Sequence, residues 1–202
     1  NISQGNIADI KARYPYIMRR VSGYNLDEFL TDDPFNLTKM VVGSEGTLCV
    51  VTEAKVNLVP RPTMTALSIL HFSDIVQASE AIVEVLRHEP SSIEVMDNIL
   101  LQRSRESLGH SGDLSFIQGD PGALLAVEFY GESEGELVSK TNTLKRDIEG
   151  KGLAYACVNI LDRPGQNRVW NLRKGGLGLL MSVHGDAKPL PFVEDTAVAP
   201  ET

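Results

Sequence analysis

The chain has 202 residues, and its 19 Lys and Arg against 27 Asp and Glu give a formal net charge of −8 at pH 7. Apolar residues make up 42% of the sequence and charged residues 23%, a balance that excludes global disorder. The acidic character argues against a general binder of nucleic acid or of anionic membranes, because such proteins cluster Lys and Arg against phosphates.

The N-terminal stretch predicts short helices that are separated by breaks. Residues 7–13 have a helical pattern, which should stop before Pro15 because proline cannot continue a helix. A turn at Gly23 should then lead into one or two helical turns that end near Leu30.

The following stretch predicts β structure. The β-rich runs 37–42 and 47–52 flank a Gly-Ser-Glu-Gly turn, and residues 54–59 alternate between apolar and polar in the manner of a third strand. The stiff Pro60-Arg61-Pro62 break then marks a predicted domain boundary. This places a first domain at residues 1–62 and a second at residues 63–202.

From residue 63 the pattern changes to alternating strands and helices. Strands are predicted at 65–72, 93–96, 123–130 and 154–160, and helices at 74–88, 97–108, 133–150 and 164–180, with a loop at 109–122. Ser73 has the chemistry of an N-cap for the first of these helices. This order could build a parallel sheet, or a ferredoxin-like antiparallel sheet with helices on one face. The two β-α-β-like halves favour the second arrangement, and the predicted class is α+β.

Cysteine, histidine and apolar patterns point to no further chemistry. Cys49 and Cys157 form no Cys-x-x-Cys pair, which predicts neither a disulfide framework nor a thiolate metal site. No His-x-x-x-His or His-x-His pair occurs, so no metal site is predicted. No apolar run is long enough to span a membrane and no signal peptide is recognisable, so we expect a cytoplasmic protein.

The first motif with functional chemistry is Val42-Gly-Ser-Glu-Gly-Thr-Leu48. Two glycines around Ser-Glu predict a turn whose backbone N–H groups can point at an anion, aided by the hydroxyls of Ser44 and Thr47. It is neither a Walker A loop nor a dinucleotide fingerprint, because the required spacings are absent. An ordinary hairpin turn is the alternative, and the motif taken alone favours it.

The second motif is Arg19-Arg-Val-Ser-Gly-Tyr-Asn-Leu26. Tyr24 and Asn25 beside a glycine turn can line a flat ring system by stacking and by amide hydrogen bonding. The alternative, favoured for this motif alone, is a helix N-terminus with Asn25 as its cap and Tyr24 packed on the core.

Together, in this order and followed by Val-Val-Thr-Glu-Ala, the two motifs resemble the flavin-binding region of the FAD-linked oxidases, the vanillyl-alcohol-oxidase-like flavoproteins. The nearest branch contains D-lactate dehydrogenases, glycolate oxidase flavin subunits and D-2-hydroxyglutarate dehydrogenases. The resemblance implies FAD as the cofactor. It implies cofactor-binding roles for Gly43, Ser44, Glu45, Gly46, Thr47, Leu48, Cys49, Tyr24 and Asn25. Cys49 stands where the family has a glycine that allows close backbone approach.

The C-terminal tail carries a third feature, Arg173 after Trp170-Asn-Leu and the more distant Lys188. An Arg fork and a Lys point charge can converge on a carboxylate, although such residues taken alone are more often on the surface. The tail resembles the end of the family's cap domain, where the matching Arg and Lys bind substrate carboxylates. Its sequence Leu-Pro-Phe-Val-Glu-Asp-Thr-Ala-Val most resembles variants fused to an iron–sulfur module, which is therefore an expected electron-accepting partner.

The resemblance also implies that the sequence is part of a longer protein. It begins at Asn1, shows no Gly-rich loop for the FAD pyrophosphate, and ends before the histidines that the family uses for a metal and for the substrate hydroxyl. We therefore expect the end of an FAD-binding α+β domain at 1–62 and an incomplete ferredoxin-like cap domain at 63–202. FAD should not be retained by this chain alone, and no catalytic residue is assigned.

The predicted function is FAD-dependent oxidation of a D-2-hydroxy acid to a 2-oxo acid by hydride transfer to the flavin. One alternative is a non-catalytic ferredoxin-like module that binds small molecules or partners, since a fold does not determine a function. Residues 19–52 argue against it, because such a module has no need of two cofactor-type motifs. Another alternative keeps the flavin with a different substrate, as in alcohol-oxidising or ether-lipid-forming relatives.

Overall fold

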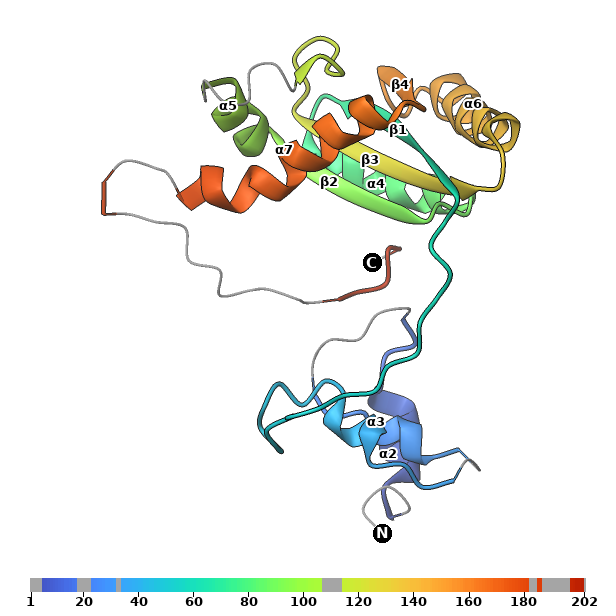
Figure 1. Cartoon of the computed structure of the whole chain (residues 1–202), viewed down its shortest axis with the longest axis vertical. Coiled ribbons are helices and arrows are strands. Elements are labelled where there is room, and N and C mark those ends of the chain that lie inside the picture. Colours follow the sequence, from blue (N-terminus) through green and yellow to red (C-terminus); the bar gives the residue numbers. More distant parts are fainter. Residues whose placement is uncertain are drawn as a thin grey trace. The chain divides into compact units, whose positions relative to one another are not determined.

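The structure is a computed structural model that describes residues 5–17, 23–31, 34–106, 114–181, 185–186 and 197–201 (Figure 1). The chain divides into two compact units. The first unit comprises residues 1–59 and 191–202, and the second unit comprises residues 60–190. Within the described ranges, no helix has the length and apolar character needed to cross a bilayer.

Short helices build the first unit. Helix α2 (Ile7–Arg13) ends where predicted, because Tyr14 turns to an extended conformation ahead of Pro15. The turn at Gly23 is confirmed by its positive φ of 79°, and a 3₁₀ helix η1 (Leu26–Phe29) follows it. Helix α3 (Thr38–Val41) comes next.

The three strands predicted in this unit are wrong. Residues 37–42 contain α3, and residues 47–52 and 54–59 have no regular structure. The Asn36 side chain explains the first case, because its Oδ1 accepts a hydrogen bond from the Thr38 N–H and begins a helical turn. The other runs have β-forming side chains but no strand beside them in the described part of the unit. β-forming residues need such a ladder and a buried face to become a strand.

The second unit contains a four-stranded antiparallel sheet. Strands β1 (Met64–Phe72), β2 (Ser92–Asp97), β3 (Ala123–Gly131) and β4 (Ala156–Ile160) pair in the order β2-β3-β1-β4. In register, Met64 lies opposite Gly131, and Ser92 lies opposite Glu128. The predicted ferredoxin-like antiparallel sheet is therefore confirmed over the parallel alternative.

Helices cover both faces of this sheet, whereas the sequence predicted helices on one face. Helices α4 (Ile75–Leu86) and α6 (Glu134–Gly150) pack on the face that carries Ala66 and Leu70 of β1. Helices α5 (Asn98–Glu106) and α7 (Arg163–Met181) cover the opposite face, and Figure 1 shows α7 crossing it. Because β1 and β3 are buried on both faces, they read as near-continuous apolar runs.

The N-caps of α4 and α6 show how a side chain determines where a helix begins. Asp74 caps α4, because its Oδ1 accepts from the N–H groups of Val76 and Gln77, both at 2.9 Å. The predicted cap, Ser73, is thus wrong by one residue. Ser133, which the predicted helix 133–150 included as its first residue, is the N-cap of α6 and accepts from the Glu136 N–H at 3.2 Å.

A buried histidine fixes residues 114–122 against the end of β1. The His71 ring is fully buried, with Nδ1 3.1 Å from the Ile69 carbonyl oxygen, while the Gln118 N–H donates to Nε2 at 3.1 Å. An acceptor at Nε2 requires the neutral ring with its proton on Nδ1. Burial lowers the pKa of His71, the largest effect on this group, although backbone hydrogen bonds oppose it.

We expect this histidine to make the second unit less stable in acid. Its folded pKa lies below the ordinary value of 6.5, so the contribution of the neutral ring is present above pH 6.5 and declines as the pH falls from there through the folded pKa. His71→Gln should remove this part of the pH dependence and cost about 1–2 kcal/mol at pH 7, because a buried polar group loses its partner. Urea unfolding of both proteins from pH 5 to 8 measures both effects. If the free energy of unfolding changes equally with pH in the two proteins, the predicted role of His71 is contradicted.

Candidate functional site

The two motifs of the first unit meet in space. The Tyr24 hydroxyl lies 2.9 Å from Thr47 Oγ1, and the Asn25 amide donates to the Val42 carbonyl at 3.0 Å. Asn25 precedes η1, but its side chain forms no capping hydrogen bond there. Asn25 therefore holds the first motif, Val42–Leu48, in place, and Tyr24 is left 40% exposed.

The Gly-Ser-Glu-Gly segment is a tight turn with an unusual backbone. Gly43, Glu45 and Gly46 all have positive φ values, of 81°, 49° and 75°. Inside the turn, the Ser44 N–H donates to the Val41 carbonyl, while both the N–H and the hydroxyl of Thr47 donate to the Ser44 carbonyl. The turn thus satisfies two of the amides that the sequence suggested for an anion. Ser44 is buried, whereas the other residues from 43 to 49 are exposed.

Tyr14 braces this arrangement, and the sequence analysis did not identify it. Its hydroxyl donates to the Tyr24 carbonyl at 2.6 Å and accepts from the Leu26 N–H at 3.4 Å. The Tyr14 side chain follows α2, so a helix predicted for other reasons positions the second motif. The available signal was an aromatic residue with a hydroxyl just after a helix end, which is too common to single out.

Arg173 lies on α7 and is held by an acidic residue of the sheet. Its Nε donates to Glu94 Oε2 of β2 at 2.9 Å, and both side chains are partly exposed. Among the described residues, the terminal guanidinium nitrogens carry no hydrogen bond. Sequence reasoning missed Glu94, because its nearness to Arg173 depends on how α7 crosses the sheet. Lys188 lies outside the described residues.

On the other face of the sheet, folding brings together three side chains able to ligate a cation, which sequence spacing did not reveal. Ligand atoms of Glu84, His88 and Asp147 lie within 4.8 Å of one another. Lys151 already lies between the two carboxylates, with Nζ 2.6 Å from Glu84 and 2.9 Å from Asp147. The ammonium of Lys151 supplies the positive charge there. We call these four residues the clasp, because their ion pairs link α4 to α6.

Electrostatic effects in this clasp follow from the same contacts. The hydrogen bond from Lys151, followed by that from His88, lowers the pKa of Asp147. The hydrogen bonds to Glu84 and Asp147 raise the pKa of Lys151. Both shifts favour the charged forms, which supports the assignment of this cluster as an ion-pair network.

Comparison with known proteins adds the family. The family model "FAD linked oxidases, C-terminal domain" matches residues 61–202. The chain is 31% identical over 205 residues to a D-2-hydroxyglutarate dehydrogenase of Pantoea ananatis, which covers 95% of this chain and 20% of the relative. It is 26% identical to a D-lactate dehydrogenase of Anaerostipes hadrus (53% of this chain, 23% of the relative). It is 33% identical to glycolate oxidase subunit GlcD of Escherichia coli (40% and 17%).

The chain spans about a fifth of the length of the D-2-hydroxyglutarate dehydrogenases that it matches. The family match covers most of the second unit, including the ferredoxin-like sheet and the helix that carries Arg173. The matched relatives extend the similarity to nearly the whole chain, including the first unit with its two joined motifs. On this evidence the chain belongs to the FAD-linked oxidases, and its residues 61–202 match the C-terminal domain of that family.

Proposed function

We propose that the full-length protein is an FAD-dependent oxidoreductase that converts a D-2-hydroxy acid to a 2-oxo acid. The observation that carries this proposal is the direct contact of two motifs, Tyr24 with Thr47 and Asn25 with Val42, in a chain of this family. The names of the relatives support a 2-hydroxy acid as the substrate, because they include dehydrogenases of D-2-hydroxyglutarate and of D-lactate.

The open backbone of the turn supports a role in holding a flat cofactor. A Cβ built on Gly46 would meet nothing within 4 Å, so the backbone there is bare and open to a ligand. The residues that would hold FAD are Gly43, Ser44, Glu45, Gly46, Thr47, Leu48, Cys49, Tyr24 and Asn25. Bound FAD would supply the redox chemistry by accepting hydride from the substrate. Tyr24 and Asn25 would keep the turn in shape, with Tyr24 tied to Thr47.

The proposed division places the last part of an FAD-binding domain at 1–62 and an incomplete cap domain at 63–202. Exposed apolar side chains in the first unit support this division, since Val50 and Leu58 are 88% and 90% exposed and a complete domain would cover such a run. FAD would bind this chain alone weakly or not at all. An iron–sulfur module is proposed as the electron acceptor, because the C-terminal sequence resembles that of variants fused to such a module.

Within this scheme, Arg173 and Lys188 would bind the substrate carboxylate. The terminal nitrogens of Arg173 suit this role, because they form the flat fork that matches a carboxylate. Glu94 would act as a positioning residue, since it fixes the Nε edge of the same guanidinium. The chain thus supplies binding and orientation of the acid, while the redox step belongs to the cofactor.

Differential alkylation of the two cysteines tests the cofactor site. Cys49 is exposed, whereas Cys157 is buried in the sheet, and burial raises the pKa of its thiol to about 12. We expect Cys49 alone to react with iodoacetamide at pH 8, as read by peptide mass spectrometry. In the full-length protein, bound FAD should slow this reaction at least about tenfold, because a residue against a cofactor loses access to reagents.

Two further outcomes decide the proposal as a whole. The FAD of the full-length protein should be bleached by a D-2-hydroxy acid and not by the L enantiomer or a simple alcohol. Cys49 reacting equally fast with and without FAD would contradict the cofactor assignment. A flavin that only a simple alcohol reduces would support the alternative substrate class.

A further inference from the structure

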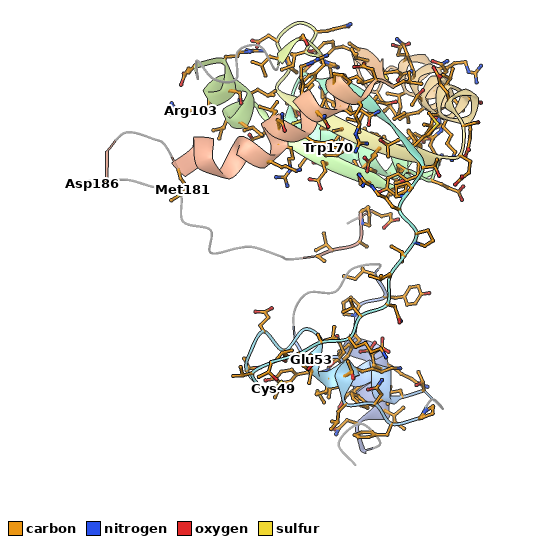
Figure 2. The ribbon with its side chains drawn as sticks, in the orientation of Figure 1. Cys49, Glu53, Arg103, Trp170, Met181 and Asp186 are labelled. Atoms are coloured by element: carbon orange, nitrogen blue, oxygen red, sulfur yellow. The ribbon has the colours of Figure 1, made fainter. Side chains whose placement is uncertain are left out.

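A polar pocket of about 330 Å³ lies along α7, on a flank of the helix that does not include Arg173. The start of β1 and the end of β3 form its other side, together with residues just ahead of β1. Trp170 of α7, labelled in Figure 2, is among the residues that line the pocket, and it also packs against the core. The pocket belongs entirely to the second unit and shares no residue with the sites described above.

Three cationic side chains border this pocket, Arg61, Arg163 and Lys174. None of them forms an ion pair within the part of the chain that the structure describes, in contrast to Arg87 and Arg105, which pair with Glu84 and Asp120. Glu128 is the one carboxylate among the residues that line the pocket, so the three cations leave a local excess of positive charge. Such an excess attracts an anion, and the guanidinium fork favours a carboxylate or phosphate.

An acceptor at the pocket wall narrows the choice of anion. Glu128 of β3 is half-buried there, where Ser92 Oγ donates to it at 3.4 Å and the Tyr130 hydroxyl also hydrogen-bonds to it. Burial raises the pKa of Glu128, although its hydrogen bonds and the charge of Arg163 oppose this shift. The charge of Glu128 in turn raises the pKa of Tyr130. An anion without a donor would face this carboxylate at a cost, whereas a ligand with a hydroxyl or ammonium group would satisfy it.

The wall between helix and strand is rigid. Gln166 is 3% exposed, and its amide donates to the carbonyls of Thr65 and Leu161 and accepts from the Thr65 hydroxyl. These bonds fix α7 to β1 beside the pocket. The pocket is therefore preformed, which lowers the entropic cost of binding a small ligand.

We propose that this pocket binds a small organic acid that carries a hydrogen-bond donor next to its carboxylate, as hydroxy acids and amino acids do. Arg163 holds the carboxylate, Arg61 and Lys174 add to the positive charge of the pocket, and Glu128 accepts from the neighbouring donor. Trp170 covers the carbon skeleton. The site is distinct from the carboxylate role proposed for Arg173, and it does not depend on FAD.

The test uses the 202-residue chain and the fluorescence of Trp170, its single tryptophan. Lactate and alanine represent the two sources of the donor, propionate lacks it, and inorganic phosphate is an anion of a different shape. We expect saturable binding of lactate or alanine that is about tenfold tighter than binding of propionate, the size of one hydrogen bond to a charged group. Equal binding of propionate or phosphate, or no saturation, would overturn the proposal. A preference for lactate over alanine, or the reverse, identifies the donor.

Variants assign the effect to individual side chains. Arg163→Ala should weaken binding about tenfold, and Glu128→Met should bring lactate and alanine to the affinity of propionate. Arg87→Ala, at the C-cap of α4 on the other face of the sheet, is the matched control and should bind like the parent chain. Circular dichroism checks that each variant is folded. If Glu128→Met keeps the preference, the acceptor role is refuted.

Arg173→Ala separates this proposal from the proposed function. Binding that survives Arg173→Ala supports a second site, as expected. Binding lost in Arg173→Ala but kept in Arg163→Ala would refute the pocket and leave the proposed carboxylate role of Arg173 standing.

Discussion

Replacing Gly122 by alanine should destabilise the second unit by about 3 kcal/mol, because added atoms in a closely packed site force the backbone to shift. A Cβ at this position would clash with the Ser73 carbonyl oxygen and would lie 2.8 Å from its carbon and 3.0 Å from Asp74 Cα. The Gly122 N–H also donates to the Phe72 carbonyl at 2.9 Å, so the two segments cannot move apart without losing that bond. This crossing joins the end of β1 to the start of β3.

Gly135→Ala is the matched control for this prediction. Gly135 lies in the first turn of α6, and a Cβ there would meet nothing within 4 Å. Alanine should leave the stability unchanged or raise it by up to about 1 kcal/mol, since alanine favours the helix over glycine. Urea unfolding followed by Trp170 fluorescence compares the two variants. Equal stabilities would show that the crossing at Gly122 can relax.

The strands of the second unit could be predicted because packing and propensity agree there. Residues 65–72 and 123–130 are apolar on both faces, and the fold gives each run a neighbour on both sides. Residues 47–52 and 54–59 include the same β-forming residue types, but they form no strand. A strand requires hydrogen bonds from another segment, and the sequence of one segment does not show whether such a segment is present.

The candidate site could be predicted only in part, for a similar reason. The two motifs were recognised one by one, and their resemblance to a family suggested that they act together. Their actual contacts, Tyr24 with Thr47 and Asn25 with Val42, depend on the path of the chain between them. The pairing of Arg173 with Glu94 and the presence of Arg61 and Arg163 at one pocket depend on the sheet register and the crossing of α7, which no local pattern contains.

Replacing Arg173 by alanine in the full-length protein should lower kcat/KM for a D-2-hydroxy acid. The expected decrease corresponds to a loss of about 2–5 kcal/mol in the binding of the transition state. The expected loss follows from geometry. Glu94 fixes Nε, and the two terminal nitrogens remain for a bidentate contact with the substrate carboxylate. Arg173→Lys should recover only part of the loss, because an ammonium offers a point charge without a fork.

Two further variants distinguish a binding role for Arg173 from a structural one. Glu94→Gln should have a smaller effect, about 1 kcal/mol, because it weakens the positioning of the guanidinium while leaving the fork intact. Arg103→Ala removes a partly exposed arginine that pairs with Glu106 on α5, and it should leave kcat and KM unchanged. The ion pair of Arg173 is partly exposed, so Arg173→Ala should cost at most about 1 kcal/mol in unfolding free energy. A large loss of catalysis with nearly unchanged stability would place Arg173 on the substrate, whereas unchanged kcat and KM would refute that role.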